Sequence, residues 1–510
     1  MSDFAPLVEP LGHTAEPAEV CARFLGLPYL MFLDSAATQH PDAHYSFLSA
    51  DPVAVVRSKG PVTELWRAGH GAWTPVVGDA LGVARDLLPA HPVEPVSGLP
   101  PFQGGVAGYI GYDWGAVLER LPRPRYDDLD VPDVVLGLYD WVIAWDHRIG
   151  TAWLVSTGLP EEGTARERQA RERMELVRGW LGGRADGRAG GHAGRWSGGQ
   201  ADGGAGIPKI SAPAYPVPHL EGAEKIGLRS TFTRAGYLDA VRRVREYIHA
   251  GDIFQANLSQ RFESRWAGPT FELYRRLRLR NPAPFAAYLA FEDLAVLSAS
   301  PERFLRLDED GRHIETRPIK GTRPRGLGPM HDAALGRALA ESQTDRAENV
   351  MIVDLLRNDL SRVCLPGTVR VPELFALEHH PTVHHLVSTV VGEIEPGAGA
   401  VDLIRAAFPG GSITGAPKVR AMEIIAELEP TQRAVYCGSI GYVSATGAMD
   451  TSIVIRTYLV RDGRVYFQAG GGIVADSDPE LEYGETVDKA RGLIETLVES
   501  LGSRGLESTA

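Results

Sequence analysis

The chain has 510 residues, which is long enough for about three average domains. Of these residues, 44% are hydrophobic and 23% charged, a composition typical of globular proteins. A net charge of −13 without a basic stretch to offset it argues against a nucleic-acid-binding protein, so an anionic substrate would need a local pocket of positive charge. Three isolated cysteines predict neither a disulfide framework nor a zinc site, and without a long apolar run or a secretory signal we expect a cytoplasmic protein.

A glycine-rich stretch divides the chain. Residues 181–206 carry too few apolar side chains to offset the entropy of ordering, so they are predicted to form a flexible linker. We therefore expect an N-terminal region, residues 1–180, and a C-terminal region, residues 207–510, that pack together as one fold.

The N-terminal region is rich in strand-forming residues. Residues 29–33 and 45–48 are short apolar runs, and residues 134–145 are almost continuously apolar. Glycine-rich turns separate such runs. Residues 161–180 are charged and favour a helix. These patterns predict a β-rich region that ends in a helix before the linker.

Helices and strands interleave after the linker. Residues 234–250 repeat apolar side chains at helical spacing, and Gly251 supplies a C-terminal stop. Residues 252–262 alternate as a strand. Further helices are predicted at 345–359 and 419–428, and further strands at 452–458 and 465–468. Because strands come in neighbouring pairs without a regular helix between them, we expect an α+β fold with antiparallel sheets.

Lys320 stands in an unusual local setting. Pro318, two residues before it, and Gly321, directly after it, restrict the backbone, so the amine is held in a definite direction. An amine in such a setting, once desolvated or placed beside a cation such as Arg317, is typical of a lysine nucleophile. The alternative is a solvated lysine in a surface turn.

Two pairs of acids have helical spacing. Asp345 and Glu348 are three residues apart, as are Glu482 and Glu485, so each pair would share one face of a helix. Oxygen ligands crowded without interleaved lysines suit a hard cation such as Mg²⁺. The alternative for either pair is a solvated helix face.

Two glycine-rich segments could approach a ligand with their main chain. Residues 408–418 do not form a P-loop, because Lys418 does not follow a glycine and no Ser or Thr follows it, yet their N–H groups could bind an anion. Residues 468–472 are predicted to form a loop directly after a strand, where three consecutive glycines would let a ligand approach closely.

Arg456 and His385 are isolated polar residues in apolar runs. Arg456 would need a carboxylate partner, either a ligand or a buried acid of the protein. His385 could be a proton donor or a hydrogen-bonded core histidine, and the core interpretation is favoured.

Residues 230–498 resemble the chorismate-utilising enzymes. The segments that carry the resemblance are GDIFQANLSQRF, SASPERFL, RPIKGTRPR, DRAENVMIVDLLRNDL, HHLVST, FPGGSITGAPKVRAMEII, CGSIGY, AGGGIVADS and EYGETVDKA. The N-terminal region resembles them more thinly, through PFQGGVAGYIGYD and GLYDW. The resemblance implies the anthranilate-synthase-like fold, a two-subdomain sandwich of antiparallel β-sheets flanked by helices.

The resemblance also implies ligands for the substrate. Glu348 and Glu485 would hold Mg²⁺, with Asp345 and Glu482 in an outer shell, and the metal would bind the ring carboxylate of chorismate. The enolpyruvyl carboxylate is assigned to Arg456, Tyr436 and the amides of Gly470 and Gly472, and Ser412 and Lys418 would line the same site.

Lys320 distinguishes members of this family. It indicates the aminodeoxychorismate synthases, because the anthranilate, isochorismate and salicylate synthases carry a small residue there. Lys320 would attack C2 of the ring as the C4 hydroxyl leaves, with Glu302 as general acid or base and His385 assisting near the metal. Ammonia would then enter at C4 and expel the lysine. Gln255 replaces the lysine with which isochorismate-type enzymes activate water.

The resemblance also implies a partner that supplies ammonia. No cysteine lies in a Gly-flanked nucleophile turn, so ammonia would come from a glutamine amidotransferase partner.

Ser35 lies where relatives bind tryptophan, with ordinary core packing between two sheets as the alternative. The runner-up function is anthranilate synthase component I, which Lys320 disfavours. A catalytically silent regulatory homologue would lack a metal-binding acid or Arg456, and none is missing.

Overall fold

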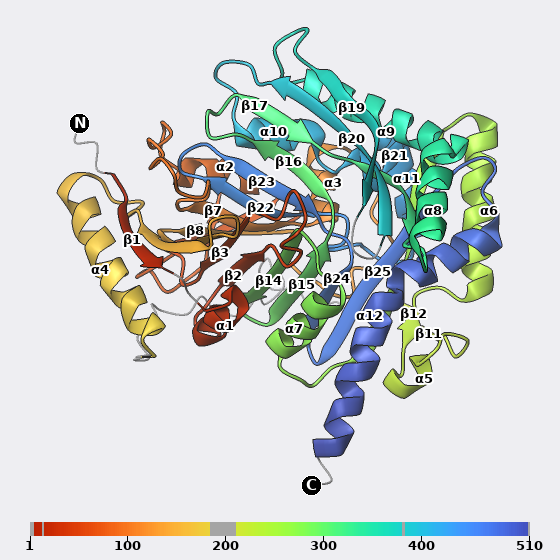
Figure 1. The fold of residues 1–510 in the computed structure, drawn as a ribbon, viewed down its shortest axis with the longest axis horizontal. Helices are drawn as coiled ribbons and strands as arrows, with labels where there is room; N and C mark the ends of the chain where they lie inside the picture. Colours follow the sequence, from red (N-terminus) through yellow and green to blue (C-terminus); the bar gives the residue numbers. More distant parts are fainter. Residues whose placement is uncertain (1–4, 13–14, 184–210, 380–382, 508–510) are drawn as a thin grey trace.

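Two large antiparallel β-sheets flanked by helices form the molecule (Figure 1). This computed structural model describes residues 5–12, 15–183, 211–379 and 383–507. Most of the predicted linker lies outside the described residues. The α+β class with antiparallel sheets is confirmed. Among the described residues, no helix combines the length and the apolar character needed to cross a membrane.

The first sheet, sheet A, has 13 strands. Their order is β1 (Leu7–Gly12), β10 (Thr151–Ser156), β9 (Trp141–Asp146), β3 (Tyr45–Ser49), β2 (Leu30–Asp34), β14 (Phe285–Phe291), β15 (Leu294–Ser300), β24 (Thr457–Arg461), β25 (Arg464–Ile473), β13 (Gln255–Arg265), β12 (Arg229–Ser230) and β11 (Tyr215–Pro216), and β21 (Gly415–Ala416) pairs with β13 beside this row.

The second sheet, sheet B, has 12 strands. Their order is β18 (Ile319–Pro324), β20 (Val383–Glu393), β17 (His313–Thr316), β16 (Arg303–Leu307), β23 (Met449–Ile453), β22 (Ser439–Ser444), β7 (Gly105–Ile110), β8 (Val134–Tyr139), β4 (Ala54–Lys59), β5 (Val62–Arg67) and β6 (Thr74–Val76), and β19 (Arg370–His379) pairs with β20.

Helices cover the sheets. The α-helices are α1 (Pro17–Cys21), α2 (Ala80–Leu87), α3 (Gly115–Leu118), α4 (Gly163–Leu181), α5 (Ala223–Ile226), α6 (Arg234–Ala250), α7 (Thr270–Arg280), α8 (Pro329–Glu341), α9 (Gln343–Ser361), α10 (Ala400–Ala407), α11 (Lys418–Leu428) and α12 (Pro479–Glu507). Short 3₁₀ turns are η1 (Ala22–Phe24), η2 (Tyr112–Trp114) and η3 (Gly411–Ile413).

Both sheets draw strands from both sides of the linker. In sheet A, β14 pairs with β2, and Tyr288 lies opposite Phe32. In sheet B, β22 pairs with β7, and Ile440 lies opposite Tyr109. The inner faces of the two sheets share one apolar core, which strands of both regions build. Residues far apart in sequence are therefore held in fixed relative positions.

Two predicted elements differ in the structure. The continuous strand at 452–458 was wrong, because β23 ends at Ile453, β24 begins at Thr457, and Arg456 between them has a φ of +52°. The loop at 468–472 was also wrong, because β25 continues to Ile473 in register with β13. The helix predicted at 234–250 is confirmed as α6.

Candidate active site

Lys320 lies in β18, at an irregularity of sheet B. Ile319 pairs with Val387 of β20, but the register shifts before the next pair, and Gly321 adopts a φ of +88°. This conformation suits glycine, and an added Cβ would lie 2.9 Å from Asp345 Oδ1. The half-buried Lys320 is directed inward, where its Nζ donates a hydrogen bond to the Ser412 carbonyl at 3.1 Å. It is thus no freely solvated turn lysine.

Glu302 lies close to Lys320, because both residues contact Ser412. Its side chain is buried, and burial raises its pKa. Three interactions lower the pKa of Glu302 without cancelling this rise. They are a hydrogen bond with the Ser412 side chain, the charge of Lys320 and a hydrogen bond with the Ile319 N–H. An amine and a carboxyl group with a raised pKa therefore share Ser412, and a raised pKa suits a carboxyl group to act as a proton donor.

Arg456 approaches the same cluster from the connection between β23 and β24. Burial lowers the pKa of its guanidinium, and the charge of Glu302 opposes that shift. The guanidinium has no hydrogen bond or ion pair with any residue that the structure describes. A largely buried arginine without a carboxylate partner is suited to bind an anionic ligand.

Four acids gather beside Lys320, on α9 and the first turns of α12. Burial raises the pKa of Glu348, Lys320 opposes it, and Glu485 and Asp345 raise it further. Burial raises the pKa of Glu482 to about 7, although a hydrogen bond from a nearby serine acts against it. Both predicted carboxylate pairs therefore meet in one place.

Two lysines compensate part of this negative charge. Burial raises the pKa of Glu485, but Lys489, which lies 2.6 Å from Glu485 Oε1, and then Lys320 outweigh burial and leave the pKa below its ordinary value. Asp345 is bound by Arg323 at 2.8 Å. The acids that remain crowded are Glu348 and Glu482.

The glycines of β25 border the acids. Strand β13 pairs with β25 as far as Ile473, whereas β24 pairs with it only as far as Phe467. The backbone of Gly470 through Gly472 is therefore open toward the side that β24 has left. A Cβ on Gly471 would lie 3.2 Å from Glu482 Oε2, so the acids face this strand.

Gln255 is the nearest polar side chain to Gly472. Its Nε2 occupies the place where a Cβ of Gly472 would stand, 1.8 Å away. The side chain of Gln255 is buried, and its Oε1 has no hydrogen-bond partner among the described residues. This amide thus stands at the glycine strand with an unused acceptor.

Tyr436 and His385 are neighbours of the cluster. Tyr436 is buried in the loop before β22, and the charge of Glu302 acts on the adjoining Cys437, so this loop lies close to Glu302. His385 is buried on β20, and its Nδ1 lies 2.9 Å from Oγ1 of Thr322, a residue of the lysine's strand.

Lys418 is held elsewhere. Its Nζ donates to Asp359 Oδ2 and to the Ala407 carbonyl, both at 2.7 Å. Burial lowers the pKa of Lys418, and the charge of Asp359 opposes that shift. The structure therefore joins Lys418 to α9 and α10, not to the group around Lys320.

Ser35 lies in a pocket between the sheets. Its hydroxyl donates to the Tyr45 carbonyl at 2.6 Å. Three carboxylates line the pocket, and its other walls are largely apolar or aromatic. The carboxylates are Asp34, Asp42 and Asp450, and the apolar and aromatic residues include Leu33, Tyr45, Phe47, Phe285 and Tyr442.

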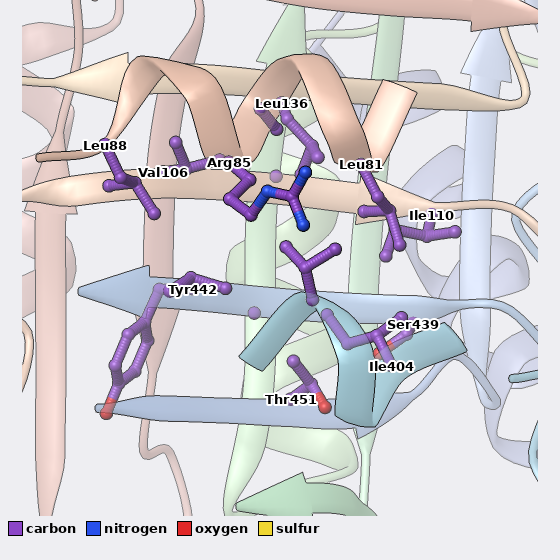
Figure 2. Close-up of a pocket in the computed structure, with 15 residues that line it drawn as sticks. Leu81, Arg85, Leu88, Val106, Ile110, Leu136, Ile404, Ser439, Tyr442 and Thr451 are labelled. Carbon is purple, nitrogen blue, oxygen red and sulfur yellow. The ribbon is translucent and has the colours of Figure 1, made fainter. Parts of the chain in front are cut away.

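Another cavity lies on the outer face of sheet B (Figure 2). One wall of this cavity is formed by Leu81 and Arg85 of α2 and by Leu88, the residue that follows the helix. Ile404 of α10 lies opposite. Its lining is mainly apolar and includes none of the catalytic candidates. The reacting groups identified above therefore do not belong to this cavity.

Sequence reasoning missed three residues that organise the acids. Lys489 binds Glu485 and also donates to the Gly470 carbonyl at 2.9 Å. Ser477 donates to Glu482 Oε1 at 2.6 Å, and Arg323 binds Asp345. The spacing of Glu485 and Lys489, four residues apart on a helix, was the one signal that could have revealed a partner.

Comparison with known proteins identifies relatives over most of the chain. The family model of chorismate binding enzymes matches residues 32–495. The aminodeoxychorismate synthase component 1 of Salmonella typhimurium is 44% identical over 474 residues, which are 92% of this chain and 93% of the relative. The anthranilate synthase component 1 of Thermus thermophilus is also 44% identical, over 407 residues and 80% of each chain.

A solved structure agrees with this similarity. The anthranilate synthase component I of Streptococcus pneumoniae superimposes with a TM-score of 0.70 at 30% sequence identity. The match covers 89% of this chain and 93% of that one.

Proposed function

The chain belongs to the family of chorismate binding enzymes, and from this premise we propose that it is a cytoplasmic enzyme that aminates chorismate at C4 with ammonia. The product would be 4-amino-4-deoxychorismate, a precursor of p-aminobenzoate and folate. The observation that carries the proposal is the convergence of Lys320 and Glu302 on Ser412. An amine beside a carboxyl group with a raised pKa matches the two tasks of the first step, nucleophilic attack and proton donation.

In that step the Lys320 amine forms a bond to C2 of the ring. The two conjugated ring double bonds shift, the C4–oxygen bond breaks, and the hydroxyl leaves as water with a proton from Glu302, which regains a proton from the alkylated amine. Ammonia then attacks C4, both double bonds shift back, the C2–nitrogen bond breaks to release the lysine, and the new amine gives up one proton. The raised pKa of Glu302 supports its role as the acid. A lysine bound at C2 also prevents loss of the C2 proton, which pyruvate elimination would need.

Arg456 would bind the enolpyruvyl carboxylate, because its guanidinium has no ion-pair partner among the described residues. Tyr436 and the open backbone of Gly470 and Gly472 would complete this side of the site. A dianion held at both ends keeps its ring in a fixed orientation toward Lys320. His385 would assist from β20, the strand that pairs with the strand of Lys320.

We propose that Glu348 and Glu485 hold Mg²⁺, with Asp345 and Glu482 nearby. Crowded, partly buried acids fit a divalent cation, and the pKa values of Glu348 and Glu482 are raised first by burial and then by their acidic neighbours. Within the described residues no group of three or more acids, histidines or cysteines is spaced to hold a metal. Two carboxylates completed by water and substrate are the usual environment of Mg²⁺. When bound, the ion would neutralise the ring carboxylate of chorismate.

The ammonia would come from a glutamine amidotransferase subunit. All three cysteines of this chain are buried. Burial raises the pKa of Cys364 to about 11 and that of Cys437 to about 12, and it also raises that of Cys21. None therefore offers the thiolate that a glutaminase needs. The word "component" in the name of the Salmonella relative agrees with a second subunit.

We also propose that the pocket around Ser35 binds tryptophan. Its aromatic walls suit an indole ring. Titration with tryptophan, followed by calorimetry, should show binding that a bulky replacement of Ser35 removes. Absence of binding to the wild-type protein would favour ordinary packing between the sheets.

Mass spectrometry of the products formed from chorismate, Mg²⁺ and an ammonium salt tests the proposed function. We expect aminodeoxychorismate, which becomes p-aminobenzoate only when a lyase is added. Formation of anthranilate and pyruvate would instead support the second candidate, anthranilate synthase component I, which the Thermus relative brings into consideration.

A further inference from the structure

One carboxylate from the N-terminal region joins the two segments that carry the reacting groups. Asp42, in the connection between β2 and β3, accepts a hydrogen bond from Arg303 at Oδ1 and one from Arg317 at Oδ2, both at 2.7 Å. Arg303 directly follows Glu302. Arg317 precedes Lys320 by three residues, and Pro318 stiffens the backbone between them.

The anchoring of Arg303 is extensive. Its guanidinium binds both oxygens of Asp450, at 3.1 and 3.2 Å, and it also binds Glu315 at 3.0 Å. Only 6% of the Arg303 side chain is exposed, so water replaces these partners poorly. Since Glu302 shares a peptide bond with Arg303, the position of this arginine fixes the backbone of the acid.

The anchoring of Arg317 has the same effect on the lysine. Besides Asp42, Arg317 binds Glu378 of β19 and donates to Thr389 of β20 at 3.4 Å. The Pro318 carbonyl accepts from the Ser388 N–H at 3.2 Å. The short connection from β17 to β18 is therefore held at both ends before it reaches Lys320.

We propose that Asp42 is a positioning residue that sets the placement of Glu302 relative to Lys320 by holding Arg303 and Arg317 together. The inference rests on the proposed function of that pair. It assigns the N-terminal region a part in the chemistry, although Asp42 does not itself touch the reacting groups.

The electrostatics support this role. Burial raises the pKa of Asp42, but Arg303, Arg317 and then His40 outweigh burial, so the carboxylate stays charged. Without that charge, two neighbouring guanidinium groups would lose the carboxylate that lies between them and repel each other. Asp42 and Asp450 also line the pocket that contains Ser35, so this pocket and the catalytic segments share two carboxylates.

The test is Asp42→Asn, which preserves the shape of the side chain and removes its charge. A matched control is Asp128→Asn. Asp128 binds Arg261 at 2.9 and 2.5 Å, and the exposed fraction of its side chain, 15%, equals that of Asp42. Chorismate consumption with ammonium gives kcat and KM for each variant, and thermal unfolding gives the stability. Asp42→Glu, which keeps the charge, is the conservative variant.

We expect Asp42→Asn to lower kcat by about 10- to 100-fold, the order expected for a displacement near 1 Å, with KM for chorismate changed less than about threefold. Asp128→Asn should lose similar stability but keep kcat within about twofold, and Asp42→Glu should recover most of the activity. Equal kcat in Asp42→Asn and the wild type, or equal losses in both asparagine variants, would overturn the proposal.

Two further measurements keep the result unambiguous. If Asp42→Asn does not fold, Arg317→Lys carries the test, because lysine keeps the charge but cannot bind Asp42 and Glu378 through a fork. Its kcat should fall about tenfold or more, and an unchanged kcat would contradict the proposal. Products are identified separately. A wild-type protein that forms anthranilate would disprove the proposed function, while chorismate consumption would still report on Asp42.

Discussion

Replacing Asp113 by asparagine should stabilise the protein, and much more at pH 8 than at pH 5. Asp113 in η2 accepts a hydrogen bond from the Ala434 N–H at 2.7 Å and so holds the loop that carries Tyr436. Burial, followed by the charge of Asp133, raises the pKa of Asp113 from 3.8 to about 7, although Lys59 opposes this rise.

The sign follows from proton binding in the two states. An aspartate in the unfolded chain titrates near its ordinary pKa of about 3.9, so between about pH 4 and pH 7 the folded state keeps a proton that the unfolded state has lost. The stability that this group contributes is therefore complete below about pH 4 and is lost as the pH rises through 7. The difference between the two pKa values corresponds to about 4 kcal/mol. Of this, about 2.5 kcal/mol falls between pH 5 and pH 8, and because water reaches part of the side chain we expect about 2 kcal/mol.

Urea unfolding at pH 5 and pH 8 measures this difference. Asparagine keeps an oxygen that can accept from Ala434, so the variant retains the loop contact. The control is Asp86→Asn, since the side chain of Asp86 is 76% exposed and lies near Arg85. The gap in unfolding free energy between Asp113→Asn and the wild type should widen toward pH 8, while that of the control stays constant. A gap that is equal at both pH values would refute the reasoning.

Three further changes address the site directly. Lys320→Ala should reduce aminodeoxychorismate formation by about a thousandfold or more while chorismate still binds, and an unchanged rate in a product assay would remove the nucleophile role. Glu485→Gln should abolish Mg²⁺-dependent turnover and any rise in melting temperature with Mg²⁺, whereas retained turnover at ordinary Mg²⁺ would exclude Glu485 as a ligand. Arg456→Lys should raise KM for chorismate about 10-fold or more with a smaller effect on kcat, because lysine lacks the bidentate fork; steady-state kinetics with an unchanged KM would assign Arg456 a purely structural role.

Local signals in the sequence predicted the elements whose ends are encoded nearby. The helix at 234–250 ends where Gly251 adopts the left-handed conformation, and the Thr233 hydroxyl caps its other end. The acids on α9 and α12 could be paired in the same way, because helical spacing places them on one face. In these cases the residues that decide the structure lie within one helical turn of each other.

Distant partners account for the failures. Gly470 through Gly472 were predicted to form a loop directly after a strand, but pairing with β13 keeps them extended. Lys418 is bound by Asp359, 59 residues away, a contact that no local motif indicates. Asp42 stands in a segment without any local motif, and Arg303 lies 261 residues further along. Such contacts arise only when the strands of both regions have assembled.

The mixing of strands from the two regions also bears on how the chain reaches its folded state. A hydrogen bond from Ser35 joins residues separated by 249 positions, and one from Gln103 to Ser444 joins residues separated by 341. During synthesis, β2 and β7 therefore emerge from the ribosome long before β14 and β22 can cover their edges. Contacts of such long range slow folding, and unpaired strand edges favour aggregation. Expression of the N-terminal region alone should therefore yield insoluble protein, and slower synthesis or added chaperones should raise the yield of the whole chain.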